Sequence, residues 1–147
     1  MTEHQNKCSL LGVDCDPKRC GSDVLAFVGD GVFGLLVREY LASQSSAHAA
    51  QQHSRAVAMV RCEAQAEYMK RILPHLTEEE EGVFRRGRNY HTSHSPRKST
   101  AAYHTATGLE ALFGYLYLSG KIARIRELFE YCISKSKSES ENETQPE

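Results

Sequence analysis

The sequence lacks any long hydrophobic run, because Lys, Arg or Glu interrupts each apolar stretch. A helix that crosses a bilayer needs about 20 consecutive apolar residues, so this absence argues against a membrane role. The first 20 residues also lack the apolar core of a secretory leader and contain little of the arginine typical of organellar leaders. We therefore expect a cytoplasmic protein.

The sequence also lacks an even number of cysteines and an excess of charge of either sign. Five cysteines, an odd number spread widely along the chain, indicate a reducing compartment. Cys8, Cys15 and Cys20 gather near His4, but no pair has the C-x2-C spacing of common zinc sites, which disfavours a structural metal there. Because 18 basic residues oppose 19 acidic ones, any binding of a polyanion must come from a local patch.

The signals of β-strands are also absent. The 147 residues contain four prolines and no alternation of apolar and polar residues, so helix is the expected regular structure. The length suits one domain. Residues 1–20 and 135–147 are polar and without periodicity, and we expect them to be disordered or loosely packed around a folded domain at 21–134. The sequence thus predicts an all-α protein.

Apolar spacing and capping signals divide the chain into five helical regions. The first is apolar on several faces, which predicts a place in the middle of a bundle. Thr77 and Glu80 form a capping box, and the acidic run at 78–81 complements the helix dipole, an explanation that we prefer to a metal site. The regions run from Ser22 or Asp23 to about Leu41, from about Ala47 to Leu73 with a potential break near Arg61, from Thr77 to about Arg86, from Tyr103 to Leu118, and from Lys121 to about Ser134.

Two carboxylates, Asp30 and Glu110, stand inside apolar helices in the same unusual setting. Small residues flank each of them at i−4 and i+4: Ala26 and Gly34 around Asp30, and Ala106 and Gly114 around Glu110. Small side chains let another backbone approach closely, so we expect the two helices to cross here and the carboxylates to meet.

Carboxylates that meet away from water repel each other and require a cation or shared protons. Hard oxygen ligands with open positions suit Mg²⁺. The alternative is that each acid is an ordinary residue at the edge of its helix, or that it pairs with an arginine such as Arg38.

Residues 82–109 form a local basic segment without any Asp or Glu. Its cations alternate with Ser, Thr, Asn and Tyr, a composition that can contact phosphate and sugar. The alternative is a solvated loop. The segment leads directly into the helix that carries Glu110, which would place phosphate-binding groups beside a metal. Its basic side chains include Arg85, Arg86, Arg88, Arg97, Lys98 and His104.

Two segments resemble the signature helices of ribonuclease III endonuclease domains: residues 25–32 (LAFVGDGV) and residues 109–118 (LEALFGYLYL). The sequence is further similar to the Mini-ribonuclease III branch. The segments that carry this likeness are 64–66 (AQA), 77–81 (TEEEE), 86–89 (RGRN) and 96–98 (PRK). The larger family usually has additional acids where this sequence has Ala26 and Thr107, and the Mini branch resembles this chain in lacking them. The number of metal ions is therefore left open.

The resemblance implies an all-α, ribonuclease III-type endonuclease domain at 21–134 that forms a homodimer and cuts both strands of double-stranded RNA with Mg²⁺. Asp30 and Glu110 would be the catalytic residues and metal ligands, supported by Thr107 and Gln65. The implied substrate is a ribosomal RNA precursor, cleaved to leave 5′-phosphates. Because 37 residues follow Glu110 in this sequence, we expect no double-stranded-RNA-binding domain, and the catalytic domain itself would bind the RNA. The implied RNA-binding residues are Arg85, Arg86, Arg88, Asn89, Arg97, Lys98 and His104.

Two other functions stay open on the sequence. The first is a catalytically inactive ribonuclease III-like module that binds duplex RNA or ribosomes, as the reduced set of acids would allow. The second is a helical protein-interaction domain with a basic loop.

Overall fold

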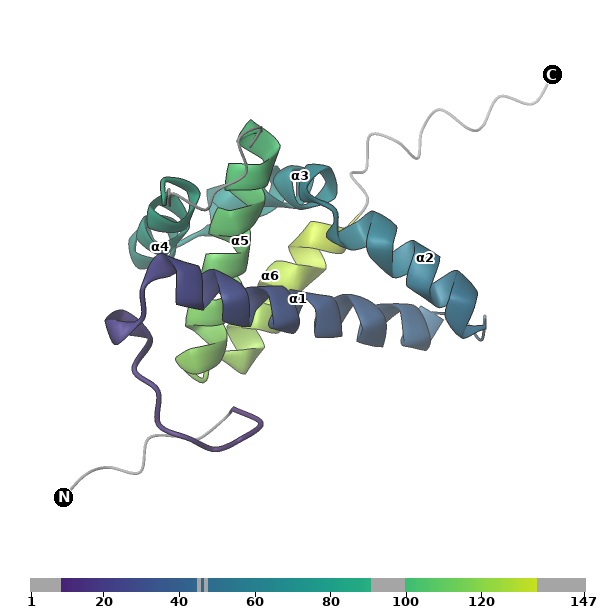
Figure 1. The fold of residues 1–147 in the computed structure, drawn as a ribbon, viewed down its shortest axis with the longest axis horizontal. Coiled ribbons are helices and arrows are strands. Elements are labelled where there is room, and N and C mark those ends of the chain that lie inside the picture. The colour runs from purple at the N-terminus through teal and green to yellow at the C-terminus, as the bar shows by residue number, and fades with distance from the viewer. Residues whose placement is uncertain (1–8, 45, 47, 91–99, 135–147) are drawn as a thin grey trace.

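The structure is a computed structural model that describes residues 9–44, 46, 48–90 and 100–134. All regular structure in these residues is helical, which confirms the all-α prediction (Figure 1). The elements are η1 (Pro17–Arg19), α1 (Ser22–Gln44), α2 (Ala49–Val60), α3 (Cys62–Ile72), η2 (Leu73–His75), α4 (Glu78–Arg88), α5 (Ala101–Leu118) and α6 (Ile122–Ile133).

Local signals account for the helix bounds. Arg61 has an extended backbone (φ −63°, ψ 153°) that separates α2 from α3, at the predicted break. The predicted capping box at the start of α4 is present, with Thr77 and Glu80 each accepting from the other's backbone N–H. α5 begins two residues before the apolar periodicity does, because the Thr100 hydroxyl accepts from Tyr103 N at 3.1 Å and caps the helix.

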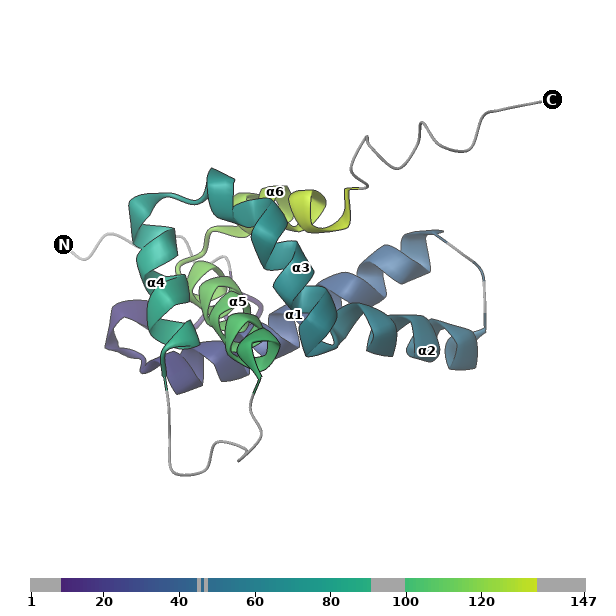
Figure 2. The same cartoon turned by 90° about the horizontal axis from the view of Figure 1, so that it is seen from above.

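Helix α5 forms the centre of the fold. It packs against α1, α3, α4 and α6, and Figure 2 shows it enclosed between α4, α1 and α3. Phe113 of α5 is fully buried and meets Phe33 of α1 edge to face, with ring centroids 5.5 Å apart. The middle position predicted for the first helix therefore belongs to α5.

Glycines let α5 touch its neighbours through the backbone. A Cβ on Gly29 of α1 would lie 1.6 Å from the Glu110 carbonyl oxygen, and one on Gly114 would lie 2.0 Å from the Leu25 carbonyl oxygen. On the α4 side, a Cβ on Gly108 would lie 2.7 Å from the Phe84 carbonyl oxygen. No side chain of any size fits at these crossings.

The expected crossing of the two acidic helices is therefore present, with one correction. On α5 the close approach occurs at Gly114, as predicted, but on α1 it occurs at Gly29 and not at Gly34. Gly34 instead faces Arg38, whose guanidinium donates to the Gly34 carbonyl at 3.0 Å. Within the described part of the chain, the Arg38 side chain thus donates to a backbone carbonyl and not to Asp30.

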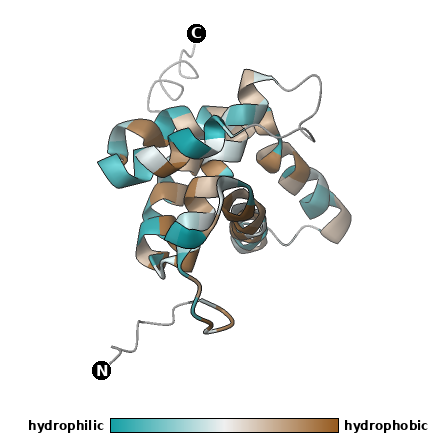
Figure 3. Cartoon of the chain, turned by 60° about the vertical axis from the view of Figure 1, so that its left-hand side comes forward, coloured by the Kyte–Doolittle hydropathy of each residue, from teal (hydrophilic) through white to brown (hydrophobic). Residues whose placement is uncertain are grey.

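Hydrophobic residues are interrupted by hydrophilic ones along the helices, as the colouring in Figure 3 shows. Among the described residues, no helix is long and apolar enough to cross a membrane.

Part of the predicted N-terminal segment is described. Residues 9–20 contain η1, which packs on α5, and the Leu10 backbone N–H donates to the Tyr117 hydroxyl at 2.8 Å. Residues 1–8 and the predicted tail at 135–147 lie outside the described residues.

Candidate active site

The crossing of α1 and α5 brings Asp30 and Glu110 together. Gly29, next to Asp30 in the chain, lies against the Glu110 backbone. The Asp30 side chain is exposed, whereas Glu110 is partly buried. Two carboxylates from distant parts of the sequence thus share one site, one open to solvent and one withdrawn from it.

The environment of Glu110 disfavours its charged form. Burial, and secondly the negative charge of Asp30, raise the pKa of Glu110 to about 7, while a hydrogen bond with the Gln65 side chain opposes them. At neutral pH this carboxyl is therefore divided between its protonated and ionised forms. A cation placed between the two acids would offset both the cost of burying the Glu110 charge and its repulsion by Asp30.

Gln65, in the first turns of α3, is the third polar side chain of the site. It is only 2% exposed. Its Nε2 donates to the Val60 carbonyl at 2.8 Å, but its Oε1 has no hydrogen-bond partner among the described residues. Leaving a buried acceptor unpaired costs about 1–3 kcal/mol, so this oxygen is suited to accept from a group that enters the site.

Thr107 and His104 precede Glu110 on α5. The Thr107 hydroxyl donates to the Tyr103 carbonyl at 3.0 Å and keeps its lone pairs available as acceptors. The His104 ring packs edge to face on Tyr103, with centroids 5.6 Å apart. Ala26 is buried, and the described residues contain no cluster of three or more His, Cys, Asp or Glu that could hold a metal ion. Among the described residues, Asp30 and Glu110 are therefore the two acids of this site.

The predicted RNA-binding arginines of α4 do not form one face. At about 100° per residue, Arg85 and Arg88 lie on the same side of the helix and Arg86 on another. Arg85 pairs with Glu81 at 3.2 Å. Arg88 lies over the Phe84 ring, 5.4 Å from its centroid.

Two further contacts complete this region. Arg88 also donates from Nε to the side chain of Asn89 at 3.2 Å. Burial and, after it, Glu79 raise the pKa of Tyr115 to about 12, and the charge of Arg86 opposes this rise. Arg97 and Lys98 lie outside the described residues.

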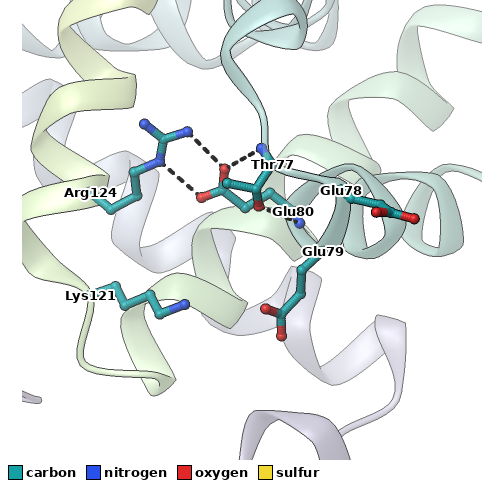
Figure 4. Close-up of a pocket in the computed structure, with 6 residues that line it drawn as sticks. All are labelled: Thr77, Glu78, Glu79, Glu80, Lys121 and Arg124. Atoms are coloured by element: carbon teal, nitrogen blue, oxygen red, sulfur yellow. Dashed lines mark hydrogen bonds and ion pairs between the residues drawn. The ribbon is translucent and has the colours of Figure 1, made fainter.

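The acidic run at the start of α4 contains Glu80, which has a structural role. This agrees with the sequence analysis, which preferred a structural explanation of the run to a metal site. Figure 4 shows Glu80 between Thr77 and Arg124. Arg124 donates to both Glu80 carboxylate oxygens, at 2.9 and 2.8 Å, and the Thr77 backbone N–H donates to one of them at 2.9 Å. Burial alone would raise the pKa of Glu80, but these donors hold it below its ordinary value.

An exposed apolar face of α1 was missed on the sequence. Phe27 is 81% exposed, Leu35 54% and Val24 45%. Beside them runs an apolar groove between α1, the end of α5 and α6. Helical periodicity identifies such a face as apolar but does not say what covers it. The groove is lined by Leu10, Val28, Gly31, Val32, Leu35, Leu36, Tyr117, Ile122 and Ile125.

Comparisons with known proteins cover the whole site. The family model described as Ribonuclease III domain matches residues 23–121. Mini-ribonuclease 3 from Thermoanaerobacter sp. (strain X514) is 41% identical over 111 residues, which are 75% of this chain and 78% of that protein. Mini-ribonuclease 3 from Enterococcus faecalis is 39% identical over 124 residues, 82% of this chain and 93% of that protein.

The fold also has a solved counterpart. The crystal structure of a protein from Fusobacterium nucleatum matches with a TM-score of 0.70 and 30% identity, covering 80% of this chain and 95% of that one. The matched family region includes both helices that carry the carboxylates.

Proposed function

This chain belongs to the Mini-ribonuclease III branch of the ribonuclease III family, and on that premise we propose that it is an endoribonuclease that cleaves double-stranded RNA. The observation that carries the proposal is the pairing of Asp30 with Glu110 at the backbone crossing of α1 and α5. The products would carry 5′-phosphates, as the family resemblance implies.

The donor set fits Mg²⁺. Asp30 and Glu110 would hold the ion, because both supply hard oxygen ligands and their mutual repulsion calls for a cation. When bound, Mg²⁺ would stabilise the negative charge that develops on a phosphodiester during hydrolysis. With two carboxylates and no cluster of three in the described residues, water and the RNA phosphate would complete the coordination.

Gln65 and Thr107 would support the carboxylates without reacting themselves. The buried Gln65 amide holds Glu110 from one side and offers the unpaired Oε1 to a water molecule in the site. The Thr107 hydroxyl, one turn before Glu110, can accept a further hydrogen bond. Gly29 and Gly114 fix the separation of the two helices that carry the acids.

The end of α4 and the start of α5 would bind the RNA backbone. The stacking of Arg88 on Phe84 and its bond to Asn89 hold its guanidinium in place for a phosphate. The exposed pair of Arg85 with Glu81 is weak enough to be exchanged for such a contact. His104 lies in the first turn of α5. Arg86, Arg97 and Lys98 complete the proposed set, and the duplex would be recognised by its A-form shape and its 2′-hydroxyls.

A homodimer would place two such sites on the two strands of one duplex. The exposed Phe27 lies beside the apolar groove on the same side of α1. In a two-fold dimer each copy presents the same surface, so each Phe27 can enter the groove of the other copy. The apolar area of α1 that its own fold leaves uncovered supports a second copy of this chain as the occupant.

The proposed substrate is a double-stranded stem of a ribosomal RNA precursor, and the proposed location is the cytoplasm. Both rest on the family resemblance and on the reducing environment that the unpaired cysteines indicate.

Incubation of the protein with end-labelled duplex RNA, with and without Mg²⁺, tests the proposal. Cleavage should require Mg²⁺ and should be lost in Asp30→Asn and in Glu110→Gln, while duplex binding persists. Glu39→Gln, which changes an exposed acid elsewhere on α1, is the matched control and should cleave normally. Binding without cleavage by the unchanged protein would favour the inactive RNA-binding module instead.

A further inference from the structure

The N-terminal segment holds two thiols together that the proposed function does not use. Asp16 caps η1 by accepting from Lys18 N at 3.0 Å, and the Cys20 backbone N–H donates to the Pro17 carbonyl at 3.2 Å. This tight turn brings the Cys15 Sγ to 3.8 Å from the Cys20 Sγ. Both cysteines are free, and Cys15 is exposed.

The position of this thiol pair is set by more than its own turn. η1 packs on α5, and the turn lines a hollow together with Glu79, Tyr115 and Lys121. Capping and packing already hold the two cysteines close together, so a disulfide between them costs little further conformational entropy. This favours a bond within one chain over a bond between two chains.

A metal site is the competing use of two adjacent thiols. Soft metals in structural sites take four ligands, and the described residues contain no group of three or more His, Cys, Asp or Glu placed to hold an ion. With two thiols and no third ligand among the residues that the structure describes, the pair suits oxidation to a disulfide better than metal binding.

We propose that Cys15 and Cys20 are a redox modification site that forms an intramolecular disulfide by exchange with a small-molecule disulfide of the glutathione class. The thiolate of Cys15, the more exposed partner, attacks one sulfur of the small disulfide and releases one small-molecule thiolate, leaving a mixed disulfide. The Cys20 thiolate then attacks the Cys15 sulfur and releases the second. The cysteines lose two electrons and two protons, the small disulfide gains the electrons, and the protons go to the released thiolates.

The charges around the turn are mixed. Lys18 and Arg19 lie between the two cysteines in the chain. Burial and the neighbouring Cys15 and Asp16 raise the pKa of Cys20. Because Cys15 is also the more exposed of the two, it is the first to react.

The bond would close a ring over residues 15–20 at the base of the N-terminal segment. Nearer the N-terminus, the Leu10 backbone N–H donates to the Tyr117 hydroxyl, and Leu10 borders the apolar groove. Oxidation would therefore restrict a segment that lies beside the surface proposed for the second copy, without touching Asp30 or Glu110.

The test is peptide mapping of the full chain after equilibration in reduced and oxidised glutathione, with free thiols blocked before digestion. Trypsin cuts after Lys18 and Arg19 and so separates Cys15 from Cys20 into different peptides, which stay joined only by a disulfide. Cys8 shares the peptide of Cys15, so mapping is repeated in Cys8→Ser. The expected result is loss of two of the five thiols and a joined peptide that survives in Cys8→Ser and Cys62→Ser but disappears in Cys15→Ser and Cys20→Ser.

Three results would overturn the proposal: no joined peptide at any glutathione ratio, a joined peptide that disappears in Cys8→Ser, or a purified protein whose stoichiometric zinc shields both thiols from oxidation. RNA cleavage plays no part in the readout, so failure here is distinct from failure of the proposed function.

Discussion

Gly29 lies against Glu110 so closely that a Cβ on Gly29 would fall 1.6 Å from the Glu110 carbonyl oxygen. The contact joins the backbones of the two helices whose carboxylates form the candidate site. Because backbone atoms cannot rotate away as a side chain can, any larger residue at Gly29 must push α1 and α5 apart.

We therefore expect Gly29→Ala to destabilise the fold by about 1–3 kcal/mol or more, the cost typical of overpacked cores. Cleavage should be abolished. Gly31→Ala is the matched control for stability two residues along α1, because a Cβ there has no neighbour within 4 Å in the single chain. Gly31 lines the apolar groove, so this control concerns unfolding and not cleavage. That change should be neutral or should stabilise the fold by up to about 1 kcal/mol, since alanine is the better helix former. Urea unfolding followed by circular dichroism measures both. Equal stabilities of the two variants would contradict the close crossing.

The stability of the metal-free protein should depend on pH through Glu110. Its pKa is about 7 in the folded state against an ordinary value of 4.5, so the folded state binds this proton more tightly than the unfolded state does. The stabilisation is fully present below about pH 4.5 and is lost as the pH rises through 7. We expect a loss of about 1–2 kcal/mol, reduced from the full shift because solvent reaches the carboxyl.

Glu110→Gln should remove this part of the pH dependence, which is measured as the difference between the two unfolding profiles from pH 4 to 8. Mg²⁺ should stabilise the unchanged protein more at pH 8 than at pH 6, because the carboxyl must lose its proton to bind the ion. Parallel profiles for Glu110→Gln and the unchanged protein would show that Glu110 does not titrate in this range.

Gln65→Met tests the supporting role of the buried amide. Loss of a side chain that orients a metal ligand usually costs about 10- to 100-fold in activity or metal affinity. We expect slower cleavage and a higher Mg²⁺ requirement, with duplex binding unchanged. Gln52→Met is the control, because Gln52 also donates from its amide to a backbone carbonyl, that of Leu41, at 3.2 Å. A similar shift in Mg²⁺ requirement in both variants would point to a purely structural effect.

Phe27→Asp tests the proposed dimer face. Because Phe27 is 81% exposed in the single chain, its replacement should leave the fold of each copy intact while placing a charge in the interface. We expect sedimentation at micromolar concentration to shift from dimer to monomer, and cleavage of duplex RNA to fall with it. Val57→Asp changes an exposed apolar residue on α2 and should have neither effect. A monomeric unchanged protein would rule out the dimer.

Features governed by neighbouring residues were the most predictable from the sequence. Thr77 and Glu80 form their capping box within one turn, so their pattern is readable without knowledge of the fold. The break at Arg61 was likewise anticipated. The meeting of Asp30 and Glu110 was predictable because small residues repeat around both, although the contact lies at Gly29 and not at Gly34.

The sequence did not predict where the long side chains of α4 point. Nor did it predict which surface covers the apolar face of α1. Arg85, Arg86 and Arg88 are close in sequence, but the helix turns them to different sides and the side-chain contacts decide where each one ends. The apolar pattern of α1 is the same whether its own chain or a second copy buries Phe27, so hydrophobic periodicity placed this helix too deep in the bundle.

The glycine contacts of α5 bear on how freely this sequence can vary. Gly29, Gly108 and Gly114 carry no functional group, yet each occupies a place where a single methyl group would collide with backbone. Arg85 and Arg86 of α4, which would bind the RNA, are exposed and have room to be exchanged. In a library of all single substitutions, these chemically silent glycines should therefore tolerate fewer replacements than the charged residues that would touch the substrate.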